Sequence, residues 1–238
     1  MKLRKPSGLA IALAMAVSVT LTLSLISAAH ALTLRLSGYG GTTTINDGDP
    51  GDTCPTPGCV GFTGPLGDFI VNITTGISGS PSTASLLLSS LDVFSPGPNP
   101  DTLTIELTDI GFLPSGGFST RELVSTISGL LTASGSSATP SQCVGVGTFD
   151  CSIVTIAHGT FSGPGPYMDT RTAFFSSGTP FSITETVALA FTGSGTSSLT
   201  FVSTVVPQPR ALLLLGLGLA GLWALPMLRA SRRGRDDN

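Results

Sequence analysis

Apolar and polar residues alternate along several stretches in the central part of the chain. From Thr102 to Thr108 the sequence reads TLTIELT, which places three aliphatic side chains on one face of an extended segment. A period of two is typical of a β-strand that buries one face and exposes the other. The same period recurs at 32–36, 69–73, 183–191 and 199–205. Further strands are expected at 86–94 and 153–161, and at 121–131, where a helical turn at the start is the alternative.

Clusters of Gly, Pro, Asn and Asp separate these stretches, for example at 47–48, 96–100 and 163–166. Gly and Pro supply the backbone conformations that tight turns need. Many short strands between such turns predict an all-β fold, an antiparallel β-sandwich. A solenoid is the alternative, but the sequence has no clean internal repeat.

The first 31 residues have the three parts of a secretory signal peptide. Three basic residues open the chain, an uncharged apolar run follows at 8–26, and Ala29 and Ala31 form the small-residue site that signal peptidase cleaves. We therefore expect an N-terminal signal helix that signal peptidase removes after Ala31. The apolar run is long enough to span a membrane, so a permanent anchor is the alternative.

A second uncharged run, rich in Leu and Gly, lies near the C-terminus at 211–228 and is long enough for one membrane crossing as a helix. Basic residues follow at once, and they hold that end of a span in the cytoplasm. They are Arg229, Arg232, Arg233 and Arg235. We therefore expect a C-terminal transmembrane helix with the folded domain outside. A buried core helix would leave the Arg cluster unexplained, and the GxGxxG pattern in the run lacks the preceding strand that a nucleotide site needs.

Pro207, Gln208 and Pro209 precede this run, and the three features together resemble a PEP-CTERM sorting segment. In that family a Pro-Glu-Pro motif, a transmembrane helix and a basic tail form one signal. The resemblance implies processing by exosortase, a membrane-embedded cysteine transpeptidase, and then release or attachment outside the cell. Gln208 stands where the family has Glu and lacks its charge, and a chain left uncleaved for that reason would stay anchored in the membrane.

Short blocks at 42–52, 102–112 and 181–186 also resemble segments of PEP-CTERM proteins. This resemblance implies an extracellular, β-rich protein and brings no catalytic residues with it. The chain is thus predicted to consist of a signal peptide (1–31), an extracellular β-sandwich (32–204) and a sorting segment (205–238).

Charge in the predicted exported part is strongly unbalanced. Between residues 32 and 206 three Arg stand against twelve Asp and Glu, a net charge near −9, and there is no Lys. Nucleic acid and anionic lipid surfaces need a basic patch, so neither is expected as a partner of this domain. Mechanisms that use a Lys nucleophile, a Schiff base or a Lys cross-link are excluded there.

Four cysteines fall in this part, and an even number in an oxidising compartment indicates disulfides. Of the three possible pairings we expect the two local ones, Cys54–Cys59 and Cys143–Cys151. Each closes a short loop and should stabilise the fold by about 2–3 kcal/mol at most. Zinc is not expected, because the Cys spacing is not C-x-x-C and His158 is the one His of this part.

The turn at 46–52 is the sharpest cluster of candidate metal ligands. Asp47, Asp49 and Asp52 offer oxygen atoms of the kind that Ca²⁺ prefers, but the bidentate Glu of an EF-hand is missing. A solvated acidic turn is therefore favoured, with these three residues as a weak Ca²⁺ candidate.

Candidate catalytic residues are few. His158 could serve a Ser-His-Asp triad, but no G-x-S-x-G elbow supports one, so a packed or surface His is favoured. The glutamates are Glu106, Glu122 and Glu185, and spacing alone does not exclude a carboxylate pair for glycoside hydrolysis. No catalytic constellation is recognisable, and we expect neither an enzyme nor a cofactor.

Two functions fit this profile. The first is an exported structural or interaction protein of the cell surface or extracellular matrix. The alternative is a carbohydrate-binding module associated with exopolysaccharide. Sugar rings stack on exposed aromatic rings, but the only Trp, Trp223, lies in the predicted span, which leaves Tyr39 and Tyr167. Most Phe fall in or beside predicted strands and are expected in the core.

Overall fold

The computed structural model describes residues 32–79, 84–97, 101–113 and 120–207. The predicted signal peptide lies outside the described residues, including Ala29 and Ala31, and so does the sorting segment from Gln208 onward. That segment includes Pro209, the predicted span at 211–228 and Arg229, Arg232, Arg233 and Arg235. Within the described ranges, no helix is long and apolar enough to cross a membrane.

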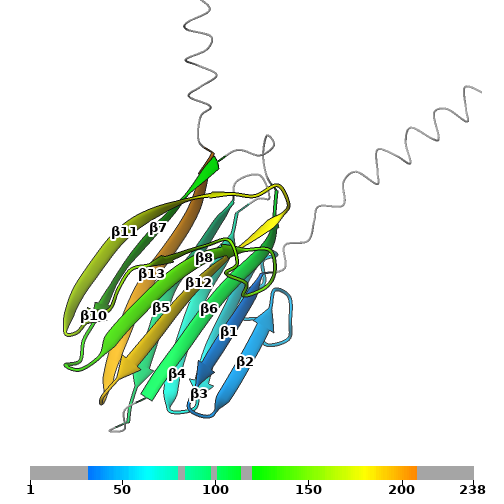
Figure 1. Ribbon diagram of the computed structural model, residues 1–238. Helices are drawn as coiled ribbons and strands as arrows, with labels where there is room; N and C mark the ends of the chain where they lie inside the picture. The colour runs from blue at the N-terminus through cyan, green and yellow to red at the C-terminus, as the bar shows by residue number, and fades with distance from the viewer. Residues whose placement is uncertain (1–31, 80–83, 98–100, 114–119, 208–238) are drawn as a thin grey trace, which may run out of the picture.

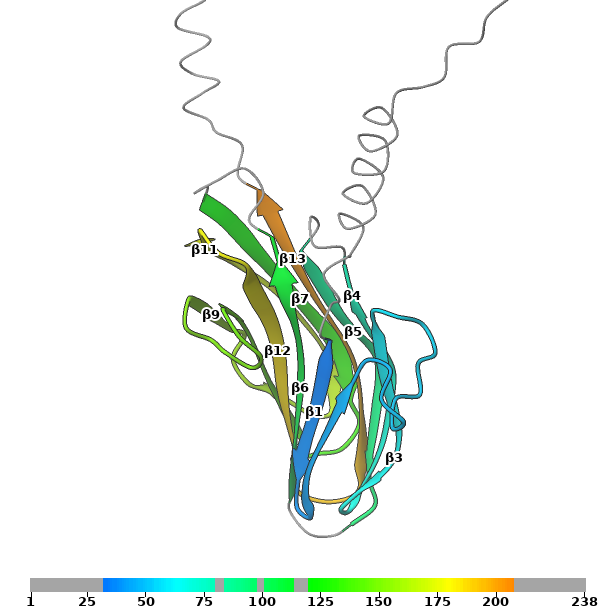
Figure 2. The same cartoon turned by 90° about the vertical axis from the view of Figure 1, so that its right-hand side faces the viewer.

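The described chain folds as an all-β antiparallel sandwich of two sheets, which Figure 1 shows from the front and Figure 2 after a quarter turn. Sheet A has the order β10-β8-β12-β6-β1-β2, with β9 also paired to β8. Its strands are β1 (Thr33–Gly38), β2 (Gly41–Asn46), β6 (Asp101–Phe112), β8 (Ser137–Gly145), β9 (Val154–Ala157), β10 (Phe161–Ser162) and β12 (Phe181–Phe191). Sheet B has the order β11-β7-β13-β5-β4-β3. Its strands are β3 (Cys59–Leu66), β4 (Phe69–Ser78), β5 (Ser85–Ser95), β7 (Thr120–Leu131), β11 (Gly165–Ser176) and β13 (Gly195–Pro207).

The apolar positions of the alternating stretches form the core between the sheets. Leu36 on β1 lies opposite Ile105 on β6, which in turn lies opposite Val187 on β12, and all three are fully buried. On sheet B, Phe201 of β13 pairs with Ile127 of β7 in the same way. Each such side chain contributes about 1.5–3 kcal/mol when it leaves water. The predicted all-β sandwich is confirmed for the described residues.

Three elements differ from the sequence expectation. Residues 120–131 form a strand throughout, without a helical turn, because Arg121, Leu123, Ser125 and Ile127 all point into the sandwich. The stretch 153–161 is two strands, β9 and β10, separated at 158–160. Strand β13 runs on to Pro207, past the expected boundary at 204, and stays in register with β7 to its end.

Both expected disulfides are present. Cys54–Cys59 joins the β2–β3 connection to the first residue of β3, and Cys143–Cys151 joins β8 to the loop that follows it. That loop packs on the outer face of sheet A, where the ring of Phe149 lies 3.9 Å from the guanidinium carbon of Arg35. Two disulfides are typical of a protein that folds outside the reducing cytosol, at the cell surface or beyond it.

Candidate functional site

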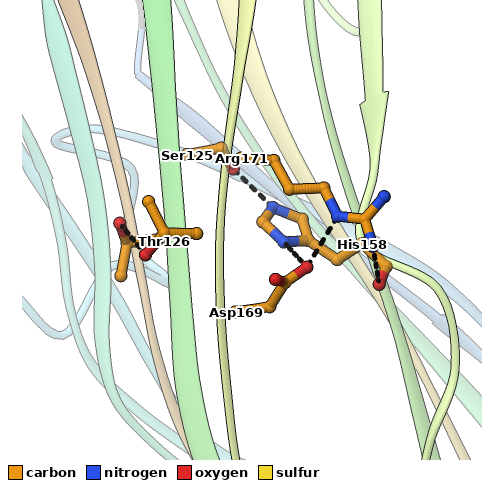
Figure 3. Close-up of polar contacts among 6 residues, drawn as sticks. Ser125, Thr126, His158, Asp169 and Arg171 are labelled. Carbon is orange, nitrogen blue, oxygen red and sulfur yellow. Dashed lines mark hydrogen bonds and ion pairs between the residues drawn. The ribbon is translucent and has the colours of Figure 1, made fainter.

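The structure brings Ser125, His158, Asp169 and Arg171 together, a group we call the His158 cluster (Figure 3). The Oγ atom of Ser125 lies 2.6 Å from His158 Nε2, and His158 Nδ1 lies 3.0 Å from Asp169 Oδ2. Arg171 donates from Nε to the same carboxylate oxygen at 2.7 Å and from Nη2 to the carbonyl of His158 at 3.3 Å. The connectivity is that of a Ser-His-Asp triad with an added arginine.

Strand pairing explains why these residues meet. In β11, Asp169 lies opposite Ile127 of β7 and Arg171 lies opposite Ser125. Directly opposite residues share a face of the sheet. Because Ile127 and Ser125 are buried in the sandwich, the side chains of Asp169 and Arg171 point toward sheet A as well. The segment between β9 and β10 brings His158 from sheet A into this space, where its ring packs edge-on against Phe201 at 5.6 Å.

Hydrogen-bond partners fix the tautomer of His158. The ring donates from Nδ1 to the Asp169 carboxylate, and Nε2 accepts from the Ser125 hydroxyl. Burial lowers the pKa of His158 below its usual 6.5, against the opposing effect of Asp169. The hydrogen bond from Arg171 holds the pKa of Asp169 below its usual range. A neutral imidazole beside a charged carboxylate is therefore the resting state at neutral pH.

The burial order of the cluster is the reverse of what nucleophilic catalysis needs. Ser125 is fully buried in the sandwich, and the His158 side chain has no exposed surface. Asp169 and Arg171, by contrast, expose 27% and 50% of their side chains. A serine nucleophile must reach the substrate while the carboxylate orients the imidazole from behind. In this conformation the cluster ties sheet A to β7 and β11 and presents no nucleophile to solvent.

A second buried polar group lies close to Ser125. Ser203 of β13 pairs directly with Ser125, and its hydroxyl donates to Oε1 of Glu185 on the facing sheet. Burial raises the pKa of Glu185 to about 8, so this carboxyl is mostly protonated at neutral pH. Gln142 of β8, directly opposite Glu185, is buried as well. A row of polar side chains thus crosses an otherwise aliphatic core.

The three glutamates do not form a catalytic pair. Glu185 points into the core, whereas Glu106 pairs with Thr186 and so projects from the outer face of the same sheet. There it forms an ion pair with Arg35 at 2.5 Å. Glu122 belongs to β7 and lies on the outer face of sheet B, opposite Phe174. A glycosidase needs two carboxyl groups facing one substrate, and no two of these glutamates share a face.

The acidic turn uses its carboxylates on its own backbone. Asp52 accepts from the backbone N–H groups of Gly48, Cys54 and Gly61 at 2.8–3.0 Å, and Asp47 accepts from Gly58 at 2.6 Å. Asp49 accepts from the backbone and the side chain of Asn46. Among the described residues, no group of three or more His, Cys, Asp or Glu is placed to hold a metal ion. The turn is therefore built as a backbone cap for its own loop.

The two tyrosines differ sharply. Tyr39, at the tip of the β1–β2 hairpin, is 77% exposed. Tyr167 stacks on Phe161 with ring centroids 4.7 Å apart, and burial raises its pKa to about 12. Of the two rings named from the sequence as sugar platforms, only Tyr39 is free to stack on a ligand.

The sequence did not point to the His158 cluster as a unit. Its members come from β7, β11 and the β9–β10 connection, and Ser125 and Arg171 are 46 positions apart in the sequence. No local motif joins them, because strand pairing alone sets their distances. The sequence did contain one signal that Ser125 faces the core, because it lies two positions from both Leu123 and Ile127 in a segment with a period of two.

Fold and site together define an all-β, two-sheet, disulfide-containing sandwich with a polar row through its core. No protein-family model matches the chain. No curated protein matches it either.

Solved structures match the chain only at low identity and low TM-score. The enzymatically active domain of bacteriophage CBA120 tailspike protein 4 has 7% identity and a TM-score of 0.35, and the match covers 59% of this chain but only 20% of that one. TmCBM61 in complex with β-1,4-galactotriose has 9% identity and a TM-score of 0.30, with 61% and 92% covered. A carbohydrate-binding module of Cellvibrio mixtus lichenase 5A with cellotriose has 12% identity and a TM-score of 0.22, with 67% and 93% covered. TM-scores this low do not establish a common fold, so function has to be inferred from the chain's own geometry.

Proposed function

We propose that the chain is an exported structural or interaction protein of the cell surface or extracellular matrix, and that it has no catalytic activity. Its precursor is processed by signal peptidase and exosortase, and it acts through the outer faces and edges of the sandwich.

The burial of the candidate chemical groups supports this proposal. Ser125, His158 and Glu185 hold the two sheets together from inside, and the acidic turn caps its own loop. The exposed surface of the described residues instead carries hydroxyl groups and scattered apolar side chains. Across the outer face of sheet B, for example, Thr126 bonds to Thr170 at 3.0 Å, with Val202 and Met168 exposed nearby on the same sheet. Such a face suits contact with a partner rather than chemistry on one.

Cell fractionation followed by intact-mass measurement tests the proposed route. We expect the protein in the envelope or medium, with Leu32 as its first residue and an end near 206–209. A mass that corresponds to a chain from Leu32 that still includes 211–238 would support the surface location but show that exosortase does not cleave the protein. A cytoplasmic protein with its first 31 residues intact would contradict the proposal.

Carbohydrate binding is the second candidate, and the exposed ring of Tyr39 favours it in this chain. A glycan array probed with wild type and Tyr39→Ala tests this function. Phe174→Ala is the matched control, because this ring is 61% exposed on β11, far from the hairpin in sequence and on the other sheet. A signal that falls tenfold in Tyr39→Ala and persists in Phe174→Ala would establish a sugar platform. If the wild type gives no signal on the array, carbohydrate binding is not supported and the structural or interaction role remains.

A further inference from the structure

The two sheets of the sandwich end in four edges, and an unprotected edge can pair with another chain. Natural proteins protect edges by keeping them short, by placing Pro or a bulge in them, or by covering them. Sheet A ends at β2, with six residues, and at β9 and β10, with four and two. Both edges of sheet A are therefore short.

Strand β3, at one end of sheet B, is protected in three ways. It contains Pro65 and a register shift between Val60 and Phe62. Its Gly61 also bonds outward, through its N–H to Asp52 and through its carbonyl to the N–H of Thr53. The acidic turn thus occupies backbone groups that a foreign strand would otherwise reach.

Strand β11, at the other end of sheet B, has none of these protections along its central part. Its twelve residues pair with β7 without a register shift, and its one Pro, Pro166, is at the second position. No described strand is hydrogen-bonded to its other edge, and Figure 1 shows it at the lateral margin of the molecule. Strand β9 and His158 contact it from the side of sheet A and leave its outer face open. Met168 and Phe174 are 72% and 61% exposed along it. This edge is long, regular and partly apolar, which are the properties that favour pairing with a further strand.

The charges of β11 indicate which strand that is. Asp169 and Arg171 are its only charged residues, and they flank Thr170, close to the middle of the strand. When two copies of β11 pair antiparallel about a two-fold axis, a residue must face itself at the axis, since opposite residues share a face. With Thr170 at the axis, Asp169 of each copy lies opposite Arg171 of the other. Met168 then lies opposite Thr172, and Pro166 opposite Phe174.

We propose that a second copy of this chain pairs with β11, in an antiparallel, two-fold arrangement centred on Thr170, to join two B sheets into one continuous sheet. The partner is the same surface on an identical molecule. The two Asp–Arg pairs contribute little to the affinity, because partly exposed ion pairs have small energies. They set the register instead, because a shifted alignment would place like charges opposite each other. The affinity comes from the ladder of backbone hydrogen bonds and the apolar side chains that flank it. This inference goes beyond the proposed function and does not depend on it.

Cysteine cross-linking on the full-length chain, purified from its host in mild detergent, tests the position of the axis. Opposite Cα atoms in antiparallel strands lie about 4.5–5.5 Å apart, within the range of about 4.4–6.8 Å that a disulfide spans. We expect Thr170→Cys to form a dimer under mild oxidation, seen at twice the mass on a non-reducing gel. Thr126→Cys is the matched control, because Thr126 shares the same outer face and bonds to Thr170 but belongs to the interior strand β7. We expect it to cross-link at least tenfold more slowly.

A charge variant tests the register. Arg171→Glu places an acid opposite Asp169 of the other copy, and we expect it to slow cross-linking of Thr170→Cys at least tenfold. Arg35→Glu makes the same change in net charge on sheet A, far from β11 in the strand order, and should leave the rate unchanged. Circular dichroism and a melting curve confirm that each variant is folded.

Equal cross-linking of the two Cys variants, absence of any dimer in the wild type by sedimentation, or equal effects of Arg171→Glu and Arg35→Glu would overturn the proposal. If the protein proves to be a monomer, the exported, non-catalytic role is unaffected, because that role is tested separately by cell fractionation and intact mass.

Discussion

Polar residues of the types that catalytic centres use are here part of the core. Ser125 and Ser203 are neighbours on the inner face of sheet B, and each bonds to a titratable group, His158 or Glu185, that comes from sheet A. A buried hydroxyl without a partner costs about 1–3 kcal/mol, so each bond offsets that cost for the serine hydroxyl it includes. The interior is held by specific bonds as well as by aliphatic packing.

Ser125 should be chemically inert in the folded protein. Its hydroxyl has no exposed surface, so a fluorophosphonate reagent cannot reach it although His158 lies at 2.6 Å. Intact mass after incubation should show no adduct. An adduct that appears in the native wild type and disappears in Ser125→Ala would show that the cluster is an accessible nucleophile, and the non-catalytic role would be lost.

Glu185 should make the fold less stable at alkaline pH. Because its pKa is raised to about 8 in the folded state and is about 4.3 in an unfolded chain, the folded state holds an extra proton between these values. Its contribution to stability is therefore full at about pH 4 and falls as the pH rises to about 8. Glu185→Gln, which cannot ionise, should be more stable than wild type by roughly 2–4 kcal/mol at pH 9 and similar to it at pH 5.

Urea denaturation at the two pH values measures this difference. Glu106→Gln is the control, because this residue lies on the outer face of the same sheet. It should lose at most about 1 kcal/mol with its ion pair to Arg35, at both pH values. An equal gain of Glu185→Gln at pH 5 and pH 9 would show that ionisation of Glu185 is not the cause.

The two edge strands of sheet B, β3 and β11, differ in how their edges are protected. The turn at 46–52 covers β3 through Asp52, and at Gly61 a Cβ atom would lie only 2.6 Å from Thr53 Oγ1. Glycine at this position therefore lets the covering segment approach the strand. The opposite edge, β11, has no neighbouring strand bonded to it along its twelve residues. One sheet thus has a closed end and an open end.

Asp52→Ala should open the β3 edge. Three backbone N–H groups lose their acceptor, and we expect a loss of roughly 1–3 kcal/mol together with faster hydrogen exchange at Gly48, Cys54 and Gly61. Asp92→Ala, on the exposed outer face of β5, is the matched control and should change neither quantity. Unchanged exchange at Gly61 in Asp52→Ala would show that the carboxylate does not protect this strand.

Sequence patterns predicted the central strands well and the edges poorly. Strands β6, β12 and β13 lie inside their sheets, so one face of each is aliphatic and the period of two is visible. In β11 the inward positions include Asp169 and Arg171, because the strand lies at the sheet margin where polar side chains reach solvent. Strand β8 was missed because Pro140 and Gln142 take core positions that usually carry aliphatic residues.

The candidate site was predictable only in part. Local cysteine pairing followed from short spacing and is present in the structure. The contact between His158 and Ser125 depends on how two sheets stack, and a single sequence carries no record of that geometry. Glu106 lies between Ile105 and Leu107 and therefore on the polar face of its strand. Glu185 instead shares the parity of Ile183 and Val187, which is the buried face of β12.

Across the chain, the distribution of amines gives a test of export. Lys2 and Lys5 are the only lysines, so a protein that begins at Leu32 has a single amine, its own N-terminus. An amine-reactive acylating reagent should therefore add one label to the exported, denatured protein, as read by intact mass. Three labels would mean that the first residues are still present, and the predicted cleavage after Ala31 would be wrong.

The place of β13 in sheet B has a mechanical consequence. This last described strand is held on both sides, by β7 and by β5, along nearly its full length. Tension applied to Pro207 along the strand must shear both ladders at once and cannot peel them apart one bond at a time. A domain tethered through this end would therefore resist being pulled open by flow or by movement of the cell.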